Sequence, residues 1–167
     1  LAGDESISEL YVLKNGMTNR SYRFSCMGKQ YILRVPGEGT DMLTNRHQET
    51  AVYRAISGRG LCDDPVYINE ENGYKISRFL ENIHVCDPYN EQDVNESLKK
   101  LKELHSMKIV VDHTFDLFGQ IEYYERLREG RRSCFEDYDV VKKNVLKLKE
   151  IVEEAACDFC LTHIDAV

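Results

Sequence analysis

The amino-acid sequence predicts an α+β fold in which an antiparallel sheet comes first and helices follow. Three observations predict it. The period of the apolar residues changes from two to 3.6 partway along the chain, Gly-containing turns separate the alternating segments, and a single helical segment interrupts them. A doubly wound α/β fold would alternate strands and helices one by one, so the observed order excludes it.

Five segments have the composition or the alternation of strands, and turn residues separate them. Gly28 lies in the short loop between the second and third segments, and the Asn72-Gly73 pair lies between the fourth and fifth. Each of these two pairs of strands is therefore predicted to form a hairpin. A helix is predicted between the third and fourth strands, with Thr40 as its N-cap and its end near Ser57. The strands are expected over residues 7–13, 21–27, 30–35, 66–70 and 74–80.

The second half of the chain has the apolar period of helices. Asn90 or a nearby residue is expected to cap the first of them, and a shorter helix is expected over residues 115–129. A third is expected over residues 138–156, with charged residues on its outer face. Three strands, one helix, two strands and then helices is the order of a protein-kinase-like fold, in which a five-stranded small lobe precedes a helical large lobe.

Composition narrows the class of protein. The chain has 167 residues and a formal net charge of −7, which argues against a general nucleic-acid binder because such a protein needs a basic surface. No apolar run approaches the roughly 20 residues that span a bilayer, and residues 1–5 do not resemble a signal peptide, so no membrane insertion is expected. The six cysteines are expected to be reduced thiols of a cytoplasmic protein rather than disulfides or a zinc site.

Arg34 places a charge in the middle of the third strand, and Glu49 lies in the helix that follows. Two interpretations remain open from these residues alone. A half-buried cation at position 34 needs an anionic partner, and Glu49 is placed to supply it. Alternatively, Arg34 is a surface charge on a wet strand face and Glu49 is an ordinary helix acid.

Two further segments could carry chemistry. The loop that contains Gly16 could present N–H and hydroxyl groups to phosphates, although the residues alone favour a plain turn. Asp165, in the segment His163-Ile164-Asp165, could accept a proton from an attacking alcohol, although an isolated tripeptide of this kind is common in loops.

Taken together and in order, four segments resemble bacterial choline kinases of the LicA type, within the choline/ethanolamine kinase and aminoglycoside phosphotransferase group. The resemblance runs from about residue 13 to residue 167. It is carried by Gly16-Met17-Thr18-Asn19 with Tyr22, by Tyr31 to Gly37, by Asn45 to Glu49, and by His163 to Val167.

The resemblance implies a site and a reaction. Arg34 would stand where protein kinases carry Lys, with Glu49 as its helix partner, and residues 77–82 would form the hinge beside the adenine. Asp165 would be the catalytic residue and His163 the structural histidine of its loop. ATP and choline would give phosphocholine and ADP, with Mg²⁺ as cofactor. The implied nucleotide-binding residues are Gly16, Met17, Thr18, Asn19, Arg20, Ser21, Arg34, Glu49, Phe79, Leu80 and Glu81.

The same resemblance divides the chain into a nucleotide-binding small lobe, residues 1–80, and the hinge with the first part of the large lobe, residues 81–167. The magnesium ligands and the choline pocket of the family lie further on, so no metal ligand is expected within the chain and the chain alone is expected to be inactive. Ethanolamine kinase, aminoglycoside kinase and a non-catalytic nucleotide-binding fragment are the alternatives, and the sequence permits a dimer.

Overall fold

A computed structural model describes residues 7–13, 18–155 and 159–163 of the chain. Their order is three strands, a helix, two strands and then helices, as predicted, and a short 3-10 helix η2 that was not predicted lies before the first helix. The structure forms two compact units. One extends to Asp112 and includes the residues from Cys160 on, and the other is His113–Phe159. The two are described separately.

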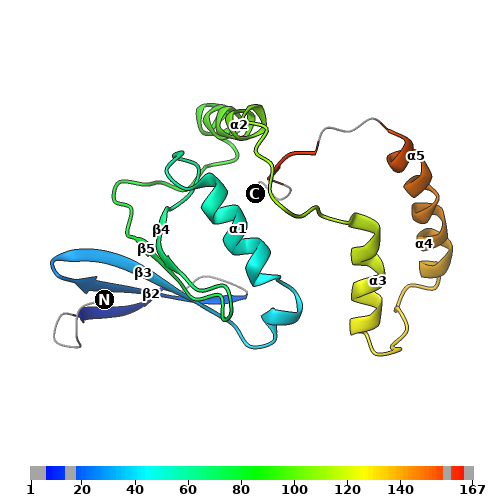
Figure 1. Cartoon of the computed structure of the whole chain (residues 1–167), viewed down its shortest axis with the longest axis horizontal. Helices are drawn as coiled ribbons and strands as arrows, with labels where there is room; N and C mark the ends of the chain where they lie inside the picture. Colours follow the sequence, from blue (N-terminus) through cyan, green and yellow to red (C-terminus); the bar gives the residue numbers. More distant parts are fainter. Residues whose placement is uncertain (1–6, 14–17, 156–158, 164–167) are drawn as a thin grey trace. The chain divides into compact units, whose positions relative to one another are not determined.

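The first unit is built on one five-stranded sheet with the order β1-β2-β3-β5-β4 (Figure 1). All neighbouring strands are antiparallel, and the two predicted hairpins are present. The β4–β5 strands are shorter than predicted because the Asn69 side chain accepts hydrogen bonds from the N–H groups of Glu71 and Asn72, which widens the turn. The strands are β1 Ile7–Leu13, β2 Asn19–Cys26, β3 Lys29–Pro36, β4 Pro65–Ile68 and β5 Lys75–Arg78.

The two faces of the sheet differ in chemistry. Phe24, Cys26 and Ile76 form the buried core on one face, with Tyr31 and Leu33 packed against them. Successive strand residues point to opposite faces. The neighbours of these core residues on β3 and β5 therefore face the other way, where Arg34 and Lys75 lie opposite each other in the register.

Helix α1, Arg46–Ile56, contacts the face that carries Arg34 and Lys75. The prediction that Thr40 caps this helix is wrong. Thr40 instead begins the 3-10 helix η2, Thr40–Met42, after Gly39 in the left-handed conformation, and its hydroxyl donates to the Gly37 carbonyl. Asn45 is the N-cap, because its backbone is extended and its side chain accepts from the Gln48 N–H.

The remaining helices follow the predicted order. Asn90 caps α2, Glu91–Ser106, as predicted, and Asp116 caps α3, Leu117–Leu127. The helix predicted over residues 138–156 is instead two segments that meet at Lys147, α4 Tyr138–Leu146 and α5 Leu148–Glu154. Near the end of the described chain, the Leu161 N–H donates to the carbonyl of the buried Ile109 at 2.6 Å. No helix among the described residues is both long and apolar enough to cross a bilayer.

Candidate active site

Arg34 and Glu49 meet between β3 and α1. Nη2 of Arg34 lies 2.6 Å from Oε1 of Glu49, and the two side chains are 16% and 18% exposed. The predicted ion pair is therefore present, and it is largely buried. The alternative in which Arg34 is an unpartnered surface charge does not describe this structure.

The guanidinium of Arg34 keeps an unused donor. Nη2 is paired with Oε1 of Glu49, but the buried Nε has no hydrogen-bond acceptor within the described part of the chain. Buried N–H groups without an acceptor cost free energy. An oxygen atom of an anion that reached this face would supply the missing acceptor.

The described part of the predicted phosphate loop begins beside this pair. Gly16 and Met17 lie outside the described residues. Thr18 accepts a hydrogen bond from the Gly37 N–H at 2.8 Å through its backbone carbonyl. Ser21 is the register partner of Arg34 on β2. The structure therefore brings one end of the loop next to the cation on β3.

For two other described residues of that loop, the contacts and the strand register do not lead to Arg34 or Glu49. Asn19 donates from its side-chain amide to the Thr18 hydroxyl at 3.3 Å. Arg20 is exposed and pairs with Val35 in the strand register, so its side chain leaves the sheet on the face opposite to Arg34.

The predicted hinge follows β5. The Phe79 N–H donates to the Gln30 carbonyl at 2.9 Å, and the Arg23 guanidinium lies over the Phe79 ring, 4.4 Å from its centre. Phe79 therefore extends the sheet, and its own N–H is already used. Leu80 and Glu81 are exposed, so their backbone is the part of the hinge that a base could reach.

Sequence reasoning missed a second buried cation. Lys75 is 8% exposed, and its Nζ donates to both carboxylate oxygens of Asp63 at 2.8 and 2.9 Å and to the Tyr53 hydroxyl at 2.9 Å. The Ser77 hydroxyl also donates to Asp63, at 2.6 Å. This cluster joins β5 to α1 and to the loop before β4. The only signal in the sequence was a lysine at the start of a strand, whose register opposite Arg34 no local pattern reveals.

Asp63 is the titratable group that this cluster perturbs. Burial by itself raises the pKa of its carboxyl, but the hydrogen bonds from Lys75 and Ser77 outweigh burial and hold the pKa below its ordinary value. Asp63 is therefore a carboxylate at neutral pH, as its partnership with a buried ammonium group requires.

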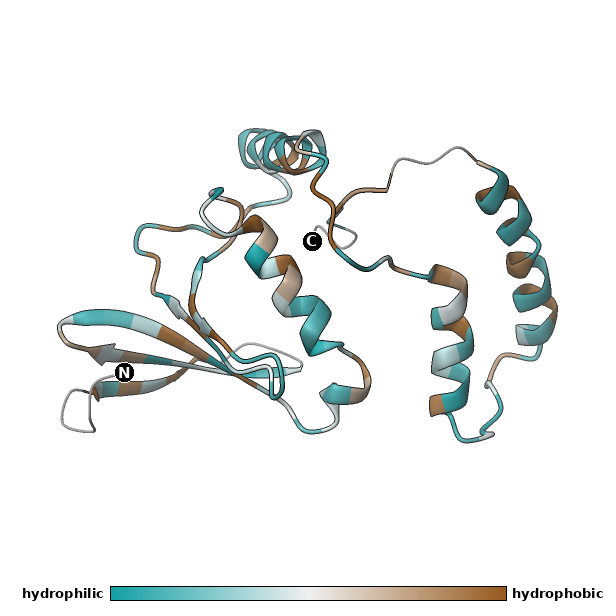
Figure 2. Ribbon diagram, in the orientation of Figure 1, coloured by the Kyte–Doolittle hydropathy of each residue, from teal (hydrophilic) through white to brown (hydrophobic). Residues whose placement is uncertain are grey.

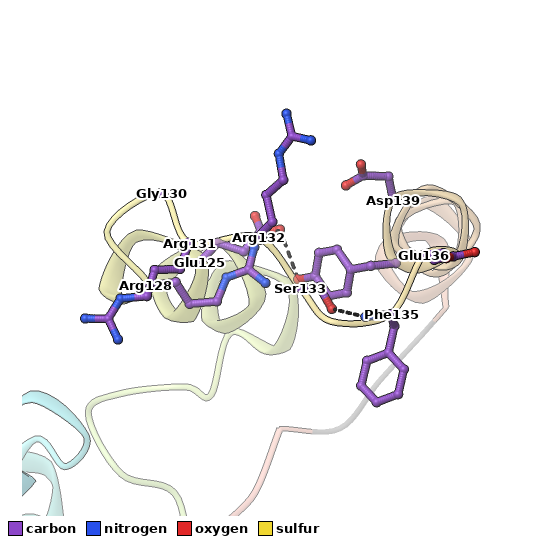
Figure 3. A pocket seen from close by; sticks show the side chains of 10 residues that line it. Glu125, Arg128, Gly130, Arg131, Arg132, Ser133, Phe135, Glu136 and Asp139 are labelled. Atoms are coloured by element: carbon purple, nitrogen blue, oxygen red, sulfur yellow. Dashed lines mark hydrogen bonds and ion pairs between the residues drawn. The ribbon is translucent and has the colours of Figure 1, made fainter.

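Each unit also has a pocket away from the Arg34–Glu49 pair. In the first unit a cavity of about 470 Å³ lies between the end of α1, the loop before β4 and the hinge, and its lining includes Cys62, Arg78 and Leu80. In the second unit a cavity of about 490 Å³ lies where α3 ends and α4 begins (Figure 3). Three arginines and three carboxylates line the second cavity, so its formal charges cancel and it favours neither sign of ligand. They are Arg128, Arg131, Arg132, Glu125, Glu136 and Asp139.

Asp165 lies outside the described residues, and His163 is exposed. Among the described residues, no three His, Cys, Asp or Glu side chains come together as a metal site would require. None of the described cysteines takes part in a disulfide.

The chain is similar to proteins that are already known. No protein-family model matches the chain. The chain is 27% identical over 124 residues to protein LicA of Haemophilus influenzae, which is 72% of this chain and 37% of LicA. It is also 27% identical over 123 residues to LicA of the Rd strain, again 72% of this chain but 46% of that protein. The chain thus spans less than half the length of these curated relatives.

Solved structures show the same likeness. The choline kinase LicA from Streptococcus pneumoniae matches 96% of this chain with a TM-score of 0.79 and 25% identity, and the match covers 57% of that chain. A structure of LicA in complex with AMP matches 98% of this chain with a TM-score of 0.77 and 25% identity, and also covers 57% of its own chain. A choline/ethanolamine kinase family protein from Mesorhizobium loti, at 19% identity, shares the fold with a TM-score of 0.73 over 95% of this chain and 52% of its own.

The fold and the buried cation–carboxylate pair define a class: the chain has the protein-kinase-like fold in its α+β form, as predicted. Within that class, its resemblance to the LicA choline kinases, predicted from four short segments, is confirmed in both sequence and structure.

Proposed function

We propose that this chain forms the nucleotide-binding part of a choline kinase-like enzyme, which transfers the γ-phosphoryl group of ATP to the hydroxyl of choline. The observation that carries the proposal is the buried Arg34–Glu49 pair, in which Nε of Arg34 has no acceptor among the described residues. The likeness to LicA supports the choice of choline, and the LicA structure with AMP supports an adenine nucleotide.

In this proposal Arg34 holds phosphate oxygens, for which its planar array of donors is suited, and Glu49 orients it. The loop of residues 16–21 covers the phosphates with backbone N–H and hydroxyl groups. The backbone at residues 79–81 forms the adenine side of the cleft, with Leu80 and Glu81 as its accessible part. Residues 1–80 act as the small lobe, and residues 81–167 as the hinge and the beginning of the large lobe.

Asp165 is the proposed catalytic residue. Its carboxylate would accept a hydrogen bond from the choline hydroxyl and take its proton as the new O–P bond forms and ADP leaves. Enzymes of this fold use Mg²⁺ to neutralise the phosphates. The described residues contain no group of ligands for this ion, so we assign no residue of the chain to it. We propose a cytoplasmic location for this enzyme, where ATP is available.

Titration of the chain with ATP by calorimetry tests the nucleotide part of the proposal. Arg34→Met should weaken ATP binding at least about tenfold, because it removes a charge-assisted contact to phosphate. Arg54→Met is the matched control, since Arg54 is on the same helix as Glu49, is 66% exposed and forms an ion pair with Glu70 at 3.4 Å, away from Arg34. Equal ATP affinity in the three proteins, or no binding by the unmodified chain, would contradict the proposal.

The acceptor needs a separate experiment, on a protein that extends over the length of the LicA relatives. Phosphorylation of choline, ethanolamine and an aminoglycoside should be compared by kcat/KM, with choline expected to be the best of the three. A preference for ethanolamine or the aminoglycoside would show that choline is the wrong acceptor, while the proposed kinase activity would stand. No turnover with any alcohol would favour a non-catalytic nucleotide-binding protein.

A further inference from the structure

Arg46 is a second buried arginine behind the Arg34–Glu49 pair. Its side chain is 8% exposed. Its Nη1 donates to Oε2 of Glu49 at 3.1 Å, and its Nη2 donates to the Thr40 hydroxyl oxygen at 2.8 Å. Arg46 therefore bridges the carboxylate on α1 and the turn that follows β3.

Glu49 is shared between the two arginines. Oε1 contacts Arg34 and Oε2 contacts Arg46, so each oxygen has its own cation. A carboxylate held at one oxygen by a hydrogen bond can no longer rotate freely about its terminal bond. The contact with Arg46 thus fixes the direction in which Oε1 faces Arg34.

The other branch of Arg46 leads to the predicted phosphate loop. The Thr40 hydroxyl, which accepts from Arg46, donates to the Gly37 carbonyl at 2.7 Å. The Gly37 N–H donates in turn to the Thr18 carbonyl at 2.8 Å. A Cβ atom at position 37 would lie 2.5 Å from the Thr18 oxygen, so the close approach of the two segments depends on glycine here.

The arrangement around Arg46 is not explained by stability alone. Its Nε is buried and has no hydrogen-bond acceptor among the described residues, and Oδ1 of Asp41 lies 3.7 Å away, beyond hydrogen-bond distance. Gly73 leaves room for it, since a Cβ there would lie 2.7 Å from both Cδ and Nε of Arg46. A buried donor without an acceptor opposes folding, so its retention points to a task in positioning.

We propose that Arg46 is a positioning residue that couples the Arg34–Glu49 pair to the phosphate loop, through Thr40 and Gly37. The inference rests on the proposed function, because the loop and Arg34 are taken to contact the phosphates of ATP. Arg46 itself touches no substrate. Its loss should therefore weaken the binding of the triphosphate and leave the binding of the nucleoside unchanged.

The test compares ATP with adenosine, each titrated by calorimetry into the 167-residue chain. Arg46→Met keeps the length of the side chain and removes both bridges. It should lower the ratio of ATP affinity to adenosine affinity about tenfold, the effect of losing hydrogen bonds to a charged group. A role that is only structural would lower both affinities together. Arg54→Met, the exposed arginine of the same helix, should leave the ratio unchanged.

A second pair of variants covers the case in which Arg46→Met does not fold. Thr40 is 7% exposed. Thr40→Val has nearly the same shape and removes only the hydroxyl that links Arg46 to Gly37, whereas Thr40→Ser keeps it. The ratio of ATP affinity to adenosine affinity should fall at least about threefold in Thr40→Val, which breaks one of the two bridges of Arg46, and recover in Thr40→Ser.

The outcomes separate the two proposals. If the unmodified chain binds ATP and neither Arg46→Met nor Thr40→Val changes the ratio, the positioning role is wrong and the nucleotide site stands. If the ratio of ATP affinity to adenosine affinity falls in Thr40→Ser as much as in Thr40→Val, the Thr40 hydroxyl does not link Arg46 to Gly37. If the unmodified chain binds no ATP, the proposed function fails, and the positioning role fails with it.

Discussion

The sheet with α1 and the helices α2 to α5 contain similar residues but bury them differently. Apolar residues occur in both regions, as Figure 2 shows for the strands and for helices α3 to α5. Yet the sheet and α1 contain a buried core and buried charges, whereas no residue within α2, α3, α4 or α5 is buried. Hydropathy patterns therefore predict which segments form helices or strands, but they do not show which charged side chains become buried.

The largest difference between the regions should appear in core truncation. Ile76→Ala, in the sheet core at 7% exposure, should lower the free energy of unfolding by about 3 kcal/mol. Ile151→Ala, on α5 at 64% exposure, should lower it by less than about 0.5 kcal/mol. Urea unfolding followed by circular dichroism measures both. Equal losses would show that α5 is buried as deeply as the sheet core, which would remove the distinction.

A smaller difference is expected between the ion pairs of the two regions. Asp63→Asn leaves the ammonium group of Lys75 buried without its anion, so it should cost about 2 kcal/mol of unfolding free energy, reduced by the partial exposure of Asp63. Glu125→Gln breaks the corresponding pair of Glu125 with Lys142, which joins α3 to α4. The cation that this change leaves without its anion is more exposed, since Lys142 is 26% exposed and Lys75 is 8% exposed, so the loss should have a smaller effect in the same urea experiment. A larger loss in Glu125→Gln than in Asp63→Asn would contradict the conclusion that the Lys75–Asp63 pair contributes more to stability.

These pairs also show what sequence reasoning reaches. The Arg34–Glu49 pair was predictable because the order of strands assigns a cation to the third strand and an acid to the next helix. The Lys75–Asp63 pair was not, because it depends on the register of β5 and on the path of the loop before β4. A local sequence pattern reveals neither the strand register nor the path of a loop, so it does not distinguish the buried Lys75 from an exposed lysine at the end of a strand.

Helix boundaries show the same limit. Asn90 was predictable as a cap because it is a preferred capping residue directly before the apolar period of α2. Thr40 was chosen wrongly because its hydroxyl has two other partners, Gly37 and Arg46, which only the folded chain brings to it. The break at Lys147 interrupts an apolar stripe that continues on both sides, so periodicity alone joined α4 to α5. The place of Asp165 lies outside the described residues and stays a prediction.

Acid should reduce the stability that the Lys75–Asp63 pair adds to the sheet region. The pKa of Asp63 is lowered in the folded chain, so the ionised carboxylate stabilises the fold above the unfolded pKa of about 3.9, and this contribution is lost as the pH falls through the lower, folded pKa. Urea unfolding at pH 6 and pH 3 should therefore show a smaller gap between the unmodified chain and Asp63→Asn at pH 3. Asp93 also has a lowered pKa, but Asp63 is not among its causes, so Asp93 contributes equally to both proteins. A gap that widens in acid would contradict the sign of the shift.

The smallest expected effect compares two asparagine caps. Asn45→Ala removes the side-chain acceptor at the start of α1, and Asn90→Ala removes the equivalent acceptor at the start of α2. Each loss should cost about 1 kcal/mol locally. Because α1 also holds Glu49 against the sheet, Asn45→Ala should lower global stability and speed amide exchange in β3 as well as in α1. Asn90→Ala should speed exchange only in the first turn of α2. Faster exchange in β3 on loss of the α2 cap would show that the two regions unfold together.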